Sequence, residues 1–178
     1  MKNPLILSAV MFASLYSATA SAHATFEQKE ATINQNYKAV IRIPHGCKGS
    51  ATTSVSVTLP EGVIKAKPMP KAGWEIDVVR GKYENTYQYH GEVTEGVKSI
   101  TWKGGKLPND FYDEFVFRAR VTDHFKANEV IYLPVIQTCE SGSNKWVEIP
   151  EAGQDAHDLK RPAPSITAIE DTSHGHHH

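Results

Sequence analysis

Apolar and polar residues alternate along most of this chain, and turn residues separate the alternating runs. Residues 37–43 and 54–59 each carry an apolar side chain at almost every second position. A period of two places successive side chains on opposite faces of an extended strand, so that one face can pack on a core. Further candidate strands are bounded by Gly, Pro, Ser or Asn: residues 74–79, 86–90, 97–103, 113–121, 130–137 and 145–149. About eight short strands and no helical stripe predict an all-β fold, a β-sandwich.

The candidate strand at residues 113–121 indicates which of its faces turns inward. Its apolar side chains share one face, which we expect to join the core: Phe115, Phe117, Ala119 and Val121. Residues 65–73 differ, because they contain Pro68 and Pro70. Proline lacks the N–H that a central strand donates, so this segment is predicted to be a loop or an edge strand.

The predicted organisation is one packed domain, residues 23–150, followed by an extended His-rich tail, residues 151–178. From about Glu151 the alternation is lost, and Pro162 and Pro164 follow. A segment without alternating apolar residues has little surface to bury, so we expect the tail to be weakly ordered.

Residues 1–22 have the composition of a secretory signal peptide. Lys2 gives a positive start, residues 4–16 are mostly apolar, and Ala20-Ser-Ala22 is a small-residue cleavage site. The apolar run is shorter than the roughly 20 residues that a membrane span needs. We therefore expect export and a mature protein of the periplasm, or of the cell exterior, that begins at His23.

Charge and motif content exclude several functions. Lys and Arg total 19 against 20 for Asp and Glu, so there is no basic excess to neutralise a phosphate backbone, and nucleic acid is not an expected partner. The motifs Gly-x-Ser-x-Gly and His-Glu-x-x-His are missing, as is a phosphate-binding glycine loop. The adjacent Asp113 and Glu114 would point to opposite faces of a strand. We predict that the protein is not an enzyme.

The chain contains two cysteines, Cys47 and Cys139. In an exported protein two cysteines are most simply a disulfide, here closing a loop of roughly 90 residues. The alternative is a thiolate metal site, although no Cys-x-x-Cys spacing is present to supply a tetrahedral ligand set.

The sharpest chemical feature would be created by signal cleavage. A mature chain that begins at His23 presents an α-amine and the Nδ1 atom of the same residue, and these two nitrogens can close a six-membered chelate on one metal ion. Both nitrogens can be deprotonated near neutral pH. Amine and imidazole nitrogen suit copper, and copper(II) stands highest in the Irving–Williams order. The alternative is that cleavage falls before a histidine by coincidence.

Several motifs are spaced in order along nearly the whole mature chain. They are the start His23-Ala-Thr-Phe-Glu-Gln-Lys-Glu-Ala, Tyr37-Lys-Ala-Val-Ile-Arg-Ile-Pro-His-Gly-Cys47, Gly62-Val, Ala72-Gly-Trp74, Tyr112-Asp-Glu-Phe115, Gln137-Thr-Cys139, Lys145-Trp-Val-Glu-Ile149 and Gly153-Gln-Asp-Ala-His-Asp158. With these motifs the chain resembles the YcnI-like copper-binding proteins of bacterial envelopes. The resemblance implies an immunoglobulin-like β-sandwich that binds one copper(II) ion.

The resemblance also implies a monohistidine brace, in which the amine and imidazole of His23 are joined by a carboxylate and by a nearby tryptophan. The tryptophan corresponds to Trp146. Glu27 is the first choice for the carboxylate, because on a strand it shares a face with His23. Glu148 and Glu140 are the alternates. From the residues alone, Glu27 could equally be a solvated charge and Trp146 a core residue.

Other histidines have weaker indications. His45 precedes Gly46-Cys47 and could be a second ligand or a loop residue that orients the cysteine, whereas His90 and His124 fall at turns and are expected to be solvated. His157 lies in a polar loop that could approach a metal. The final histidines can gather soft divalent ions: His174, His176, His177 and His178.

The expected function is copper(II) binding for homeostasis, delivery or sequestration in the periplasm. The resemblance suggests other envelope copper chaperones or a membrane copper transporter as partners. The alternatives are a copper-dependent oxidase of the histidine-brace type and a metal-free interaction module held by its disulfide.

Overall fold

The computed structural model describes residues 23–171, whose regular secondary structure is almost entirely β-strand. The predicted signal peptide and terminal histidines lie outside the described residues. The strands are β1 (Thr25–Phe26), β2 (Glu30–Thr32), β3 (Gln35–Ile43), β4 (Thr52–Thr58), β5 (Val63–Pro68), β6 (Glu75–Gln88), β7 (Glu92–Leu107), β8 (Asp113–Val121), β9 (Val130–Tyr132), β10 (Val135–Cys139), β11 (Ser143–Trp146) and β12 (Ser165–Ile169), with one 3₁₀ turn, η1 (Ala156–Asp158). The predicted all-β class is confirmed. No helix of this described part is long and apolar enough to cross a membrane.

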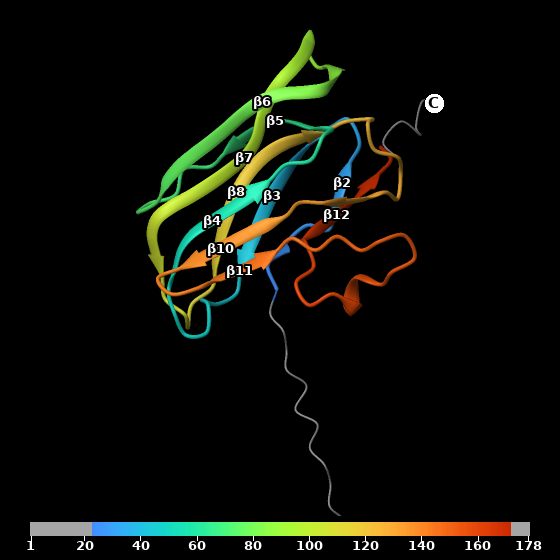
Figure 1. The fold of residues 1–178 in the computed structure, drawn as a ribbon. Coiled ribbons are helices and arrows are strands. Elements are labelled where there is room, and N and C mark those ends of the chain that lie inside the picture. Colours follow the sequence, from blue (N-terminus) through green and yellow to red (C-terminus); the bar gives the residue numbers. More distant parts are fainter. Residues whose placement is uncertain (1–22, 172–178) are drawn as a thin grey trace, which may run out of the picture.

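Two sheets stack as the layers of a β-sandwich (Figure 1). One has the strand order β1-β3-β8-β5 and the other the order β11-β10-β4-β7-β6. A small third sheet, β2-β12-β9, flanks them on the right of Figure 1. Strands β1 and β11 are therefore edge strands, each with a hydrogen-bonded neighbour on one side.

The core lies between the two layers and contains the face that the alternation predicts. Phe115, Phe117, Ala119 and Val121 are each 0–1% exposed. Trp102, which is fully buried on β7, meets Phe115 edge to face at 5.7 Å between ring centroids. Burial stabilises such a core by roughly 25 cal/mol for each Å² of apolar surface removed from water, and aromatic pairs add to this.

Two strand boundaries differ from the sequence expectation, and a third segment agrees with it. Most of the two expected strands 74–79 and 86–90 belong to one strand, β6, because the chain does not turn between them: Gly81 pairs with Gly96 of β7, and the chain reverses later. The expected strand at 130–137 divides into β9 and β10 around Pro134, which has no N–H to donate. Residues 65–73, predicted to be a loop or an edge, begin in the edge strand β5.

The segment after residue 150 also differs from the expected weakly ordered tail. Strand β12 lies between β2 and β9, and its Ile166 and Ala168 are 2% and 0% exposed. Only two alternating apolar positions mark this strand, too few to stand out in the sequence. The packed structure therefore continues to about Ile169.

The disulfide between Cys47 and Cys139 is confirmed, with a Cα–Cα distance of 6.0 Å and a sequence separation of 92. It joins the loop after β3 to the end of β10. Gly46 permits the tight loop, because a Cβ atom there would lie 1.9 Å from the Ser50 carbonyl oxygen. The bond thus connects the two layers at one end of the sandwich.

Replacing both cysteines, Cys47→Ser with Cys139→Ser, should lower the free energy of unfolding by about 4–5 kcal/mol, because the open chain regains the entropy of a loop this long. Urea denaturation followed by circular dichroism would measure the loss. Reduction of the unchanged protein should reproduce it, and an equal midpoint for all forms would contradict the role given to the bond.

Candidate functional site

His23 directly precedes the edge strand β1. The pairing of Thr25 with Arg42 and of Phe26 with Ile41 fixes the register of β1 against β3. Ala24 and Phe26 are 2% and 1% exposed, whereas His23 is partly exposed and Glu27 is exposed. Burial thus alternates, and His23 and Glu27 lie on the outer face of the strand.

A hollow of about 270 Å³ lies beside His23. Its walls come from the start of β1, from Lys29 and Tyr132, and from the segment between η1 and β12, including Pro162 and Pro164. The segment expected to be a loose tail therefore forms one wall of the amino-terminal hollow. Neither Glu27 nor Trp146 lines it.

Glu27 is engaged by Arg42. One Arg42 nitrogen lies 3.1 Å from Glu27 Oε1, and another lies 3.6 Å from Glu114 Oε1. Glu27 is four positions after His23, a span of about 13 Å in an extended chain. The two side chains share a face, but the structure does not place them in contact.

The two alternate carboxylates occupy different places. The backbone of Glu148 forms an isolated β-bridge with Pro162, which lines the hollow beside His23. The Glu148 Oε2 atom accepts a hydrogen bond from the Arg161 backbone N–H at 2.9 Å. Glu140 lies at the opposite end of β10 and β11, beside the disulfide, and pairs with Lys106 at 2.6 Å. Of these two, Glu148 is the nearer in the fold to the amino terminus.

Trp146 lies at the end of β11 and is 4% exposed. Strand β5 packs near β7, so the opposite edges, β1 and β11, lie on the same side of the sandwich. Trp146 belongs to the same core cluster as Ala24 and Phe26. Its indole is therefore a core side chain at the edge that carries His23.

His45 is held by its own loop. Gln137 is fully buried, and its side-chain amide donates to the His45 carbonyl oxygen at 2.7 Å and to Thr52 Oγ1 at 2.6 Å. Asn144 donates to the Gln137 side-chain oxygen at 2.9 Å. This network fixes the loop beside the disulfide through the His45 backbone; the two roles considered for the His45 side chain stay predictions.

The remaining histidines lie apart. His90 is in the turn between β6 and β7, with a φ of 52°, and His124 meets the Tyr87 and Phe125 rings edge to face. His157 belongs to η1, next to the amino-terminal hollow. Within residues 23–171, no three His, Cys, Asp or Glu side chains gather closely enough to hold a metal ion.

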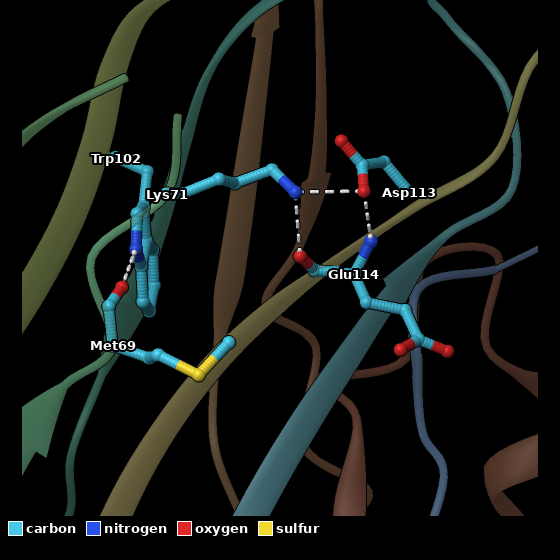
Figure 2. Close-up of polar contacts among 5 residues, drawn as sticks. All are labelled: Met69, Lys71, Trp102, Asp113 and Glu114. Atoms are coloured by element: carbon cyan, nitrogen blue, oxygen red, sulfur yellow. Dashed lines mark hydrogen bonds and ion pairs between the residues drawn. The ribbon is translucent and has the colours of Figure 1, made fainter. Parts of the chain in front are cut away.

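The Tyr112–Phe115 motif begins β8, where a lysine fixes it. Figure 2 shows Lys71 Nζ donating to Asp113 Oδ1 at 2.7 Å and to the Glu114 carbonyl oxygen at 3.0 Å. The same ammonium lies 5.0 Å from the centroid of the Phe115 ring. The Trp102 indole N–H donates to the Met69 carbonyl oxygen at 3.3 Å. The loop between β5 and β6 is thus fastened over the start of β8.

Sequence reasoning did not single out Arg42, Gln137 or Lys71 as positioning residues. The alternation in β3 does place Arg42 on the outer face, but one partner directly follows β1 and the other lies on β8, and only the register reveals them. Gln137 lies at an inward position of β10. A polar residue at a position where the alternation calls for an apolar one is the signal in the sequence that could have identified it.

The fold places this chain in a class, the immunoglobulin-like β-sandwiches. The chain is similar to an uncharacterized protein from Nocardia farcinica whose crystal structure has an immunoglobulin-like fold: identity is 24%, the TM-score is 0.61, and the match covers 83% of this chain and 98% of that one. This likeness shows the fold alone. The chain belongs to the family described as "Domain of unknown function (DUF1775)", whose model matches residues 23–168.

Two cohesins resemble the chain more weakly. The seventh ScaB type I cohesin from Pseudobacteroides cellulosolvens has 12% identity and a TM-score of 0.36, covering 88% of this chain and 97% of its own. A non-cellulosomal cohesin from Archaeoglobus fulgidus has 15% identity and a TM-score of 0.39, covering 88% and 100%. No curated protein matches significantly. At these TM-scores the cohesins carry no argument about this chain.

Replacing the fastening lysine, Lys71→Met, should lower the free energy of unfolding by about 1 kcal/mol, after allowance for solvent screening of a partly exposed ion pair. Chemical denaturation would measure it. Lys106→Met is the matched control, because the Lys106–Glu140 pair is 67% and 49% exposed and should contribute nothing measurable. Equal effects of the two changes would contradict a fastening role for Lys71.

Proposed function

We propose that the mature protein binds one copper(II) ion at its amino terminus and serves copper homeostasis in the periplasm, by delivery or sequestration and not by turnover. The observation that carries the proposal is the place of His23, at the start of an edge strand and beside a hollow. The match to the family model also begins at this residue.

The donor set fits copper(II). After cleavage the α-amine and the imidazole Nδ1 of His23 would supply two nitrogens from one residue, so the absence of a three-residue cluster in the described part does not remove the chelate. Amine, imidazole and carboxylate ligands suit copper(II). Because both sulfurs of Cys47 and Cys139 are bonded to each other, thiolates do not compete.

A carboxylate would complete the brace, and two candidates remain. Glu27 shares the outer face of β1 with His23, and an exposed ion pair such as Glu27–Arg42 contributes only about 0–1 kcal/mol that coordination would have to replace. Glu148 has no ion pair with a described residue and lies next to the wall of the hollow. We retain Glu27 as the first choice and Glu148 as the second.

Trp146 would lie near the bound ion without being its main ligand. Its core position at the edge shared with His23 supports this placement. The partners we propose are another envelope copper chaperone or a membrane copper transporter, on the basis of the resemblance to the YcnI-like proteins.

Protein with a verified His23 amino terminus should bind one equivalent of copper(II) and give an electron paramagnetic resonance spectrum of nitrogen and oxygen ligation. A form with one extra alanine before His23 has no amine at the chelate and should lose most of the affinity. Competition titration against a chelator of known affinity measures both. Equal affinity of the extended form would rule out the brace.

Glu27→Gln, Glu148→Gln and Glu140→Gln separate the carboxylate candidates. Loss of the ligand oxygen should change the copper(II) spectrum and weaken binding at least several-fold in one of the first two variants. Glu140→Gln is the control and should match the unchanged protein. Copper should also quench the fluorescence of Trp146, a loss that Trp146→Phe removes and Trp74→Phe does not. A copper(II) spectrum that is the same in all three glutamine variants as in the unchanged protein would exclude these carboxylates.

A further inference from the structure

The far half of the β6–β7 hairpin builds a second, smaller core on the outside of the sandwich. Figure 1 shows this hairpin rising beyond the other strands. The cluster joins Ile64 of β5 to three hairpin side chains, Tyr83, Tyr87 and Val93. A Cβ atom at position 96 would lie 2.0 Å from the Tyr83 hydroxyl, so Gly96 is the residue that lets this ring lie against β7. The hairpin is therefore packed against the sheet.

A polar cavity of about 390 Å³ lies between this hairpin and the end of the sheet. Its walls are Asn34, Thr86, Tyr87, Gln88, Arg120, Thr122 and Asp123. Every one of these side chains carries a hydrogen-bonding group, and the volume lies within the roughly 300–1,000 Å³ of small-molecule sites. Its chemistry fits a polar ligand.

Arg120 brings an uncompensated positive charge to this cavity. Its guanidinium carbon lies 4.6 Å from the centroid of the Tyr89 ring. Across residues 23–171 the Arg120 side chain makes no hydrogen bond or ion pair, and its Nε is buried without a partner. Arginine has five N–H donors in a planar fork that matches a carboxylate. Stacking on Tyr89 holds the group in place while its donors stay available.

Asp123 brings the opposite charge. It forms no ion pair with Arg120 or with any other cation of the described chain, so the two charges stand apart on the wall of one cavity. A simple anion would gain from Arg120 but be repelled by Asp123. A ligand with separated carboxylate and ammonium groups satisfies both.

One lining residue of the cavity, Tyr87, is preorganised. The Tyr87 hydroxyl donates to Glu61 Oε1 at 2.7 Å, and Lys98 Nζ lies 3.2 Å from Glu61 Oε2. Burial and this hydrogen bond to Glu61 raise the pKa of Tyr87 well above its usual value. The phenol therefore stays protonated and fixed by its partner over the ordinary pH range.

We propose that this cavity binds a small zwitterion, a free amino acid, with its carboxylate on Arg120 and its ammonium on Asp123. Asn34 and Gln88 supply amides to the remaining polar groups of the ligand. The site is separate from the amino terminus: Gln35 pairs with Val121 at this end of β3 and β8, and Ile43 pairs with Asp113 at the other, about 27 Å away along the strands. The proposal does not depend on copper.

Nuclear magnetic resonance titration of the mature protein with L-glutamine and L-alanine tests the site. Saturable shifts confined to the amides around Asn34, Thr86 and Thr122 are expected. Acetate, methylammonium and inorganic phosphate each offer one charge and should bind at least tenfold more weakly. Phosphate or acetate binding as tightly as the amino acids would replace the proposal with a simple anion site, and no saturable shift with either amino acid would overturn it.

Arg120→Gln and Asp123→Asn should each weaken amino-acid binding at least tenfold. Arg118→Gln changes the neighbouring exposed arginine on the same face of β8 and should leave binding unchanged. Thermal unfolding confirms that each variant is folded; because Asp123 is exposed, Asp123→Asn keeps the test decisive if Arg120→Gln loosens the hairpin. Unaltered affinity in Asp123→Asn would contradict recognition of a zwitterion.

Discussion

The contact of β8 with the opposite sheet is the interaction on which the rest of the structure depends. Phe115 meets Trp102 across the core and Trp74 beside it, with ring centroids 5.7 and 4.9 Å apart. Because β8 lies between β3 and β5, fixing its inner face also fixes the register of its neighbours. That register places His23 at one end of the sheet and Arg120 at the other.

An amino-terminal chelate needs an edge strand. A central strand has hydrogen-bonded neighbours on both sides, and a terminus that starts inside one has little room for a ligand. Strand β1 has only β3 beside it, and its ladder begins at Thr25. His23 precedes this ladder, so the proposed chelate would lie outside the β1–β3 pairing. Strand β1 is also only two residues long, and a short edge strand is a common protection of sheets against unwanted pairing.

The sequence predicts what depends on local periodicity and misses what depends on partners distant in the chain. The inward face of β8 follows from alternation, and the disulfide follows from two cysteines in a chain predicted to be exported. Strand β12 was missed, because its pairing with β2 crosses more than 130 residues and its own apolar pattern is short. The Arg42 contacts with Glu27 and Glu114 likewise arise from three strands, so no local pattern announces them.

For the carboxylate of the proposed copper site, geometry matters more than the existing ion pair. Arg42 and Glu27 are 43% and 46% exposed, so their attraction is screened and contributes about 0–1 kcal/mol. Coordination to copper(II) could replace that attraction readily.

The larger obstacle is the span of about 13 Å between Glu27 and His23 along an extended chain, which both side chains must bridge. Glu27 lies at a bend beyond the β1 ladder, where the backbone can turn without breaking sheet pairing apart from its own N–H bond to Val40. Glu148 faces the opposite balance: its backbone is fixed by two hydrogen bonds to residues 161 and 163, but it forms a bridge with Pro162, which lines the hollow. The carboxylate that binds is thus decided by whether the bend at Glu27 can close, a question of backbone conformation and not of charge.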